Sequence, residues 1–132
     1  MTDKFHPYML ENNMMHDELV YIAGPYRAKS ASKLLDNIQK ARTEALKWWK
    51  FGYTTICPHL NSAFMDGECN DENFLLGDLK LLALCDIIVV VEGWESSEGT
   101  RAEIVYAKSL NKLVMYATGQ DEQSLYLYDK RR

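Results

Sequence analysis

The chain has 132 residues, of which 47% are hydrophobic, so it is long enough for one domain with a sizeable buried core. Its formal net charge of −4 argues against a strong electrostatic attraction to a nucleic acid polymer or an anionic membrane, and small anions are better partners. The 3 cysteines have no CxxC spacing, so we expect neither a disulfide framework nor a bound metal or cofactor. The longest apolar run, residues 87–91, is too short to cross a bilayer, and a cytoplasmic location is the default expectation.

Short apolar runs alternate with longer amphipathic segments, a pattern typical of βαβ units. In chain order, the pattern predicts a strand over residues 19–23, a helix over 32–51, a strand over 53–57, a helix over 74–84, a strand over 87–91, a helix over 100–110 and a strand over 113–117. We expect an α/β fold: a doubly wound, Rossmann- or flavodoxin-like parallel sheet of four to five strands with helices on both faces. Such folds bind ligands where the strands end, so the loops after the first three strands form the expected site. The apolar spacing of the first helix places Leu46 and Trp49 on its buried face.

Both ends of the chain are expected to lie outside this fold. Residues 1–18 are predicted to be a flexible or partner-facing segment, residues 19–120 the α/β domain, and residues 121–132 a tail. Leucine and tyrosine alternate over residues 125–128 of the tail. This alternation fits either an extra edge strand or a contact with another subunit.

A polar, glycine-containing loop precedes the helix predicted over residues 100–110. Backbone N–H groups at the start of a helix bind anions, and Ser96, Ser97, Gly99 and Thr100 are therefore candidates to hold a phosphate or sugar oxygens. The alternative is that Ser97 or Gly99 only caps the helix.

Two carboxylates are candidates for glycosyl transfer. Glu103 lies just after the loop, in the predicted first turn of the helix, where the helix dipole also favours a carboxylate that has no further role. Asp78 lies in the helix that leads to the strand over residues 87–91. Such a pair can act as nucleophile and general acid through an oxocarbenium-like transition state. With 19 acidic residues in the chain, the pairing by itself is a weak signal.

Aromatic side chains surround the expected site. Tyr21 and Tyr26 flank the turn at Gly24 and Pro25, and Trp94 lies in the polar loop. An aromatic ring in such a place can stack on a base, and a phenol can position a nucleophile. The alternative for Tyr21 and Trp94 is ordinary packing in the core.

Two polar side chains follow the second predicted strand. His59 and Asn61 stand at the same edge of the sheet and can hydrogen-bond a base or a sugar. For a lone histidine, a structural role is the more common alternative.

Three blocks resemble the nucleoside 2-deoxyribosyltransferase superfamily, including its uncharacterised phage and bacterial branch and its deoxynucleoside 5′-monophosphate N-glycosidases. The blocks are residues 21–26 (YIAGPY), 77–79 (GDL) and 93–103 (GWESSEGTRAE), and the resemblance covers roughly residues 19–117. It implies a covalent mechanism in which Glu103 attacks C1′ of the sugar, Asp78 helps the base to leave and Tyr21 orients the glutamate. It also implies a homodimer or higher oligomer whose subunits share residues between active sites.

The position six residues before Glu103 points to the substrate class. In members of the superfamily that exchange bases between nucleosides, an aspartate at this position binds the sugar hydroxyls, whereas this chain has Ser97. A serine is similar to the monophosphate hydrolases, where small hydroxyls receive a phosphate that an aspartate would repel. We therefore expect an N-glycosidase that acts on a small-molecule deoxynucleoside 5′-monophosphate. Base exchange between nucleosides and a non-catalytic module that senses nucleotides are the alternatives.

Overall fold

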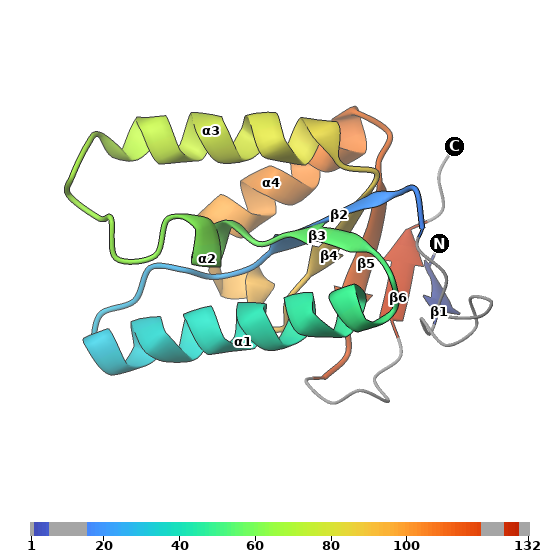
Figure 1. Cartoon of the computed structure of the whole chain (residues 1–132), viewed down its shortest axis with the longest axis horizontal. Coiled ribbons are helices and arrows are strands. Elements are labelled where there is room, and N and C mark those ends of the chain that lie inside the picture. The colour runs from blue at the N-terminus through green and yellow to red at the C-terminus, as the bar shows by residue number, and fades with distance from the viewer. Residues whose placement is uncertain (1, 6–15, 120–125, 130–132) are drawn as a thin grey trace.

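Strands and helices alternate along the described part of the chain, which in this computed structural model comprises residues 2–5, 16–119 and 126–129 (Figure 1). The strands are β1 (Thr2–Phe5), β2 (Leu19–Ala23), β3 (Thr54–Ile56), β4 (Ile87–Val90), β5 (Leu113–Ala117) and β6 (Tyr126–Asp129). The helices are α1 (Ala31–Lys50), α2 (Pro58–Asn61), α3 (Asp71–Leu84) and α4 (Glu98–Ser109), and a 3-10 turn, η3 (Trp94–Ser96), precedes α4. None of the described helices is long and apolar enough to cross a membrane.

The six described strands form one sheet in the order β1-β6-β5-β4-β2-β3. Strands β3, β2, β4 and β5 are parallel neighbours, whereas β6 pairs antiparallel with both β5 and β1. The chain runs from β2 to β3 on one side and then crosses to β4 on the other side of β2, so the strand order reverses between β2 and β4. The predicted doubly wound parallel sheet is confirmed, and the antiparallel strands extend it to six.

The two faces of the sheet are covered by different helices, α1 on one face and α3 with α4 on the other (Figure 1). Side chains alternate along a strand, so Val20 and Ile22 of β2 pack in the cluster that contains Trp48 of α1. Tyr21 points to the opposite face and packs in the cluster that contains Leu82 of α3. Because a slip of one residue would exchange the two faces, this packing determines which way Tyr21 points.

The buried face of α1 differs from the predicted one. Leu46 and Trp49 are exposed, whereas Glu44 and Lys47 are buried. Lys47 Nζ lies 3.4 Å from Oε1 of Glu44, and the Tyr126 hydroxyl donates a hydrogen bond to the other oxygen of the same carboxylate. Ion pairing and hydrogen bonding thus satisfy both buried charges, and apolar periodicity alone cannot reveal such an arrangement.

The described part of the tail is a strand, as the first of the two alternatives predicts, although not at the edge of the sheet. Strand β6 lies between β5 and β1, so it is an inner strand of the described sheet rather than an edge, and the Tyr126 side chain is buried in the core. At the other end of the chain, β1 brings residues 2–5 of the predicted flexible segment into the sheet as an edge strand. The remainder of that segment up to residue 15, and Leu125 of the tail, lie outside the described residues.

Candidate active site

A cavity of about 850 Å³ opens at the carboxyl ends of β2 and β4, where the strand order reverses. Ten of the predicted site residues line it: Gly24, Pro25, Tyr26, His59, Asp78, Ser96, Ser97, Gly99, Thr100 and Glu103. The volume falls within the usual range of small-ligand sites, about 300–1,000 Å³. Among the described residues, no group of three or more His, Cys, Asp or Glu side chains is placed to hold a metal ion.

Glu103 of α4 is joined to Tyr21 of β2 by a hydrogen bond. The fully buried Tyr21 hydroxyl donates to Oε2 of Glu103. Because α4 begins at Glu98, two residues earlier than predicted, Glu103 lies in the second turn of the helix rather than the first. The helix dipole acts mainly within the first turn, so it does not account for a carboxylate at this depth. Tyr21 is fully buried rather than half-buried, and its hydroxyl contacts Glu103, which lines the cavity.

The carboxyl groups of Glu103 and Asp78 titrate in the neutral range. Burial is the main cause that raises the pKa of Glu103 to about 7; the charge of Asp78 adds to this rise, and the hydrogen bond from Tyr21 opposes it. Burial also raises the pKa of Asp78 to about 6. The two groups therefore form a coupled pair that can hold one proton and one negative charge. The Tyr21 hydroxyl donates to Glu103 and so stabilises its charged form, but the pKa of Glu103 still lies above that of Asp78, so in the empty cavity a single proton is held mainly by Glu103.

Ser97 both caps α4 and lines the cavity. Its Oγ accepts hydrogen bonds from the backbone N–H of Thr100 at 3.2 Å and from the Thr100 hydroxyl at 2.8 Å. A hydroxyl oxygen has two acceptor positions and one hydrogen to donate, so both acceptor positions of Ser97 are occupied. Ser97 is therefore the N-cap of α4, and neither of these two contacts uses the hydrogen of its hydroxyl.

The turn after β2 is held in close contact with its neighbours. A Cβ added at Gly24 would lie only 2.9 Å from Cβ of Val91, so glycine permits this close approach of β2 to the segment after β4. His59 Nε2 lies 2.8 Å from the carbonyl oxygen of Pro25. Burial lowers the pKa of His59, so the ring is neutral and donates this N–H. His59 thus has the structural role of holding the turn while its ring lines the cavity.

The sequence matches one family model, described as "Domain of unknown function (DUF4406)", over residues 18–116. The chain belongs to the DUF4406 family. No curated protein matches its sequence. Among solved structures, the fold is similar to that of a 2-deoxyribosyltransferase from the psychrotolerant bacterium Bacillus psychrosaccharolyticus, with a TM-score of 0.56 and 22% sequence identity, over 74% of this chain and 70% of that chain. At this identity the similarity shows a shared fold, and it confirms the resemblance seen in the sequence at that level.

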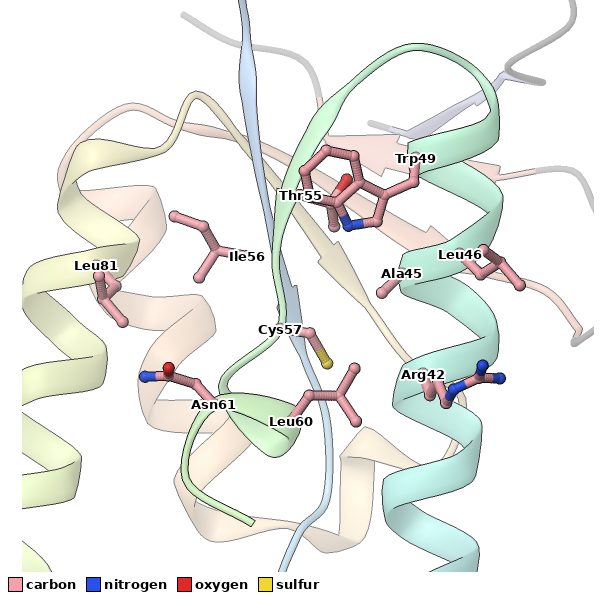
Figure 2. Close-up of a pocket in the computed structure, with 10 residues that line it drawn as sticks. All are labelled: Arg42, Ala45, Leu46, Trp49, Thr55, Ile56, Cys57, Leu60, Asn61 and Leu81. Atoms are coloured by element: carbon pink, nitrogen blue, oxygen red, sulfur yellow. The ribbon is translucent and has the colours of Figure 1, made fainter.

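Three predicted residues of this DUF4406 chain do not line the cavity: Trp94, Asn61 and Tyr21, the last of which lies behind Glu103. Trp94 packs against the apolar cluster under α3 and α4, with its ring centroid 5.4 Å from that of Tyr116. Asn61 lines a separate groove of about 550 Å³ beside β3, between α1 and α3 (Figure 2). Asn61 lies away from the cavity because it belongs to α2, a helix that the sequence pattern did not predict. Positions two apart on a helix point about 200° apart, so His59 lines the cavity and Asn61 the outer groove.

The DUF4406 cavity also contains residues that the sequence analysis did not single out. Lys33, Asn37 and Lys40 line it from α1, and Asn37 Nδ2 donates to the carbonyl oxygen of Tyr26 at 3.1 Å. Their spacing of four and three residues forms a polar stripe on the helix, which is a signal that the sequence does carry. Asp66 accepts a hydrogen bond of 2.7 Å from the Tyr26 hydroxyl across 40 positions of sequence, and nothing local predicts that contact.

Proposed function

We propose that this DUF4406 protein cleaves the bond between the base and the deoxyribose of a deoxynucleoside 5′-monophosphate, with Glu103 as nucleophile and Asp78 as general acid. The observation that carries the proposal is the hydrogen bond from the buried Tyr21 hydroxyl to Glu103, in a wall shared with Asp78. Glycosyl transfer in two steps requires one charged and one protonated carboxyl group. With pKa values of about 6 and about 7 the pair can share one proton near neutral pH, and the hydrogen bond from Tyr21 lowers the cost of moving the charge to Glu103 when substrate binds. The cavity is also large enough for a nucleotide.

In the first step, an oxygen of charged Glu103 bonds to C1′ as the bond from C1′ to the base nitrogen breaks. The electron pair of that bond leaves with the base, which receives the proton of Asp78. In the second step, the oxygen of a water molecule bonds to C1′ while the now charged Asp78 takes a proton from it, and the carboxylate of Glu103 is released. Tyr21 is a positioning residue, because it acts through the charge and orientation of Glu103.

The loop that leads into α4 supports a phosphate rather than a free sugar hydroxyl as the ligand of Ser97. The two acceptor positions of this side chain are occupied by Thr100, so Ser97 complements a group that only accepts hydrogen bonds. A phosphate is such a group, and backbone N–H groups at the start of a helix also favour it. Lys33 and Lys40 line the same cavity and add positive charge.

Base release is the direct test. The purified protein is incubated with each deoxynucleoside 5′-monophosphate, and free base is measured by chromatography. Glu103→Gln should lower the rate by about 10³-fold or more and still bind the nucleotide in calorimetry. The matched control is Glu95→Gln, which neutralises an exposed carboxylate of η3 outside the cavity and should keep the wild-type rate. Binding without base release by the wild-type protein would refute the proposal and favour the nucleotide-sensing module.

The phosphate assignment has its own test in Ser97→Asp. Aspartate is also a good N-cap, so α4 keeps its cap while the loop gains a negative charge. The value of kcat/KM should fall by about tenfold or more for a monophosphate and change much less for the nucleoside. Equal losses on both substrates would argue against a phosphate at this loop.

Base exchange is the second candidate, because the fold is similar to that of a 2-deoxyribosyltransferase. A second free base added to the reaction would then replace water in the second step. The assay is repeated with a labelled free base, and labelled nucleotide or nucleoside is compared with released base. Each exchange releases one base for every labelled product, so labelled product equal to the released base, with little free sugar phosphate, would overturn hydrolysis in favour of exchange.

A further inference from the structure

Asp66 lines the candidate active-site cavity, yet no step of the proposed reaction uses it. It lies in the segment that joins α2 to α3 at the left of the molecule in Figure 1. A carboxylate in the wall of a ligand cavity can accept hydrogen bonds from the ligand. Asp66 is therefore a candidate to contact the substrate at a place other than the reacting bond.

The Tyr26 hydroxyl holds Asp66 in place. It donates to Oδ1 of Asp66 at 2.7 Å and accepts from the backbone N–H of Phe64 at 3.4 Å. Phe64 has a φ of 63°, a left-handed conformation that a bulky residue rarely adopts unless its surroundings hold it there. The ring of Tyr26 packs edge-on against His59, with the ring centroids 5.6 Å apart. This chain of contacts connects Asp66 to the turn after β2.

Most of the hydrogen-bonding capacity of Asp66 is open to a ligand. Among the described residues, the bond from Tyr26 is the only hydrogen bond to this carboxylate, and no lysine or arginine forms an ion pair with it. Arg27, the nearest cation in sequence, binds Asp71 at 2.7 Å instead. A carboxylate has about four acceptor positions, so the bond from Tyr26 leaves several for a ligand.

The proposed function places the base on this side of the cavity, and the inference rests on that function. The phosphate is proposed to lie at Ser97, where α4 begins, and Asp78 of α3 is proposed to give its proton to the base. The base would then extend toward α3 and the segment that leads into it, away from the first turn of α4. Phe74 and Leu75 of α3 line the cavity and offer apolar surface to a flat ring.

We infer that Asp66 selects guanine as the base of the substrate. Guanine carries two neighbouring N–H donors on one edge, the ring N1–H and the amino group at C2. The two oxygens of a carboxylate can accept both, as they do from the paired N–H groups of a guanidinium. Tyr26 is a positioning residue in this contact, because it fixes the orientation of the carboxylate.

The other common bases complement this carboxylate less well. Adenine and cytosine each present one amino group beside a ring nitrogen whose lone pair faces the negative charge of Asp66. Thymine presents a single N–H between two carbonyl oxygens. A site built to accept hydrogen bonds discriminates strongly against a ligand that lacks the matching donors.

The amino group at C2 is the direct probe. Deoxyinosine 5′-monophosphate differs from deoxyguanosine 5′-monophosphate only in lacking this group. Both nucleotides are titrated by calorimetry into the Glu103→Gln protein, which is not expected to consume them. The guanine nucleotide should bind about tenfold more tightly or better, because its amino group adds a hydrogen bond to a charged acceptor.

Asp66→Asn, made in the same background, tests the carboxylate itself. Asparagine keeps the shape of the side chain and can still accept from Tyr26, but it has one accepting oxygen in place of two. The preference for the guanine nucleotide should fall to about twofold or less. The matched control is Glu68→Gln, at an exposed carboxylate of the same segment outside the cavity, which should keep the full preference. Circular dichroism melting checks that each variant is folded.

The outcomes separate this inference from the proposed function. Equal affinities for the two nucleotides, or a preference that survives Asp66→Asn, would overturn the inference even if the wild-type protein releases base. A preference that depends on Asp66 in a protein that releases no base would support the inference and refute the proposed hydrolysis. Absence of binding by both nucleotides would refute both.

Discussion

Replacing Glu103 with glutamine should stabilise the fold above neutral pH even as it removes turnover. The carboxyl group of Glu103 is costly to ionise where it lies, because burial and Asp78 raise its pKa from 4.5 to about 7. Between these two values the folded protein keeps a proton that the unfolded chain has already released, so the free energy of unfolding falls as the pH rises. The difference between 4.5 and about 7 corresponds to roughly 3 kcal/mol.

Glutamine is neutral at every pH and its carbonyl oxygen can still accept the hydrogen bond from Tyr21. The variant should therefore match the wild type near pH 4.5 and exceed it by up to about 3 kcal/mol near pH 8. Urea unfolding followed by circular dichroism, at intervals of half a pH unit, measures both curves. Glu95→Gln is the control, since it makes the same substitution at an exposed carboxylate outside the cavity. A difference between Glu103→Gln and wild type that does not grow with pH would refute the reasoning.

Three further substitutions test other contacts. Tyr21→Phe removes the hydrogen bond that lowers the pKa of Glu103, so this pKa should rise above 7 and the acid limb of the pH–rate profile should move to higher pH. Turnover at pH 7 should fall by about 10–100-fold. A loss of turnover without movement of that limb would contradict the positioning role. Gly24→Ala should lower the free energy of unfolding by about 1–3 kcal/mol in urea titration, because its Cβ would meet Val91, and Val91→Ala should recover part of the loss. Tyr126→Phe removes a hydrogen bond to a buried carboxylate of α1 and should cost about 1.5–3 kcal/mol by the same measurement, so an unchanged stability would show that this bond contributes little.

The parallel part of the sheet could be predicted because each of its strands is a short apolar run with clear boundaries. Gly24 and Pro25 end the first run, and Pro58 ends the second. Helix boundaries were less accurate, since the early turns of α3 and α4 are polar and resemble loops. Asp71 and Glu72 begin α3 at the positive end of its dipole, and Ser97 caps α4.

The chemistry of the site depended on contacts that no local pattern contains. Tyr21 and Glu103 are separated by 82 positions, and only the family resemblance placed them together before the structure did. Asn61 and Trp94 were predicted at the site because both follow the ends of strands. The sequence does not show which side of the loop each side chain faces. The turn of α2 directs Asn61 outward, and contact with Tyr116 draws Trp94 into the core.

Strands β1 and β6 are neighbours in the sheet although Thr2 pairs with Asp129, almost the full length of the chain away. During synthesis β1 leaves the ribosome before any other described strand, and its described partner β6 leaves after all of the others. The four parallel strands and their helices can associate in the meantime, because their pairings close shorter loops. Until β6 arrives, β1 has no described partner and Glu44 lacks the hydroxyl of Tyr126. Pairing of β6 therefore completes the described sheet and also supplies the hydrogen bond to the buried carboxylate of Glu44. Ribosome-bound chains that stop before Tyr126 should be markedly more sensitive to protease than chains that extend past Asp129.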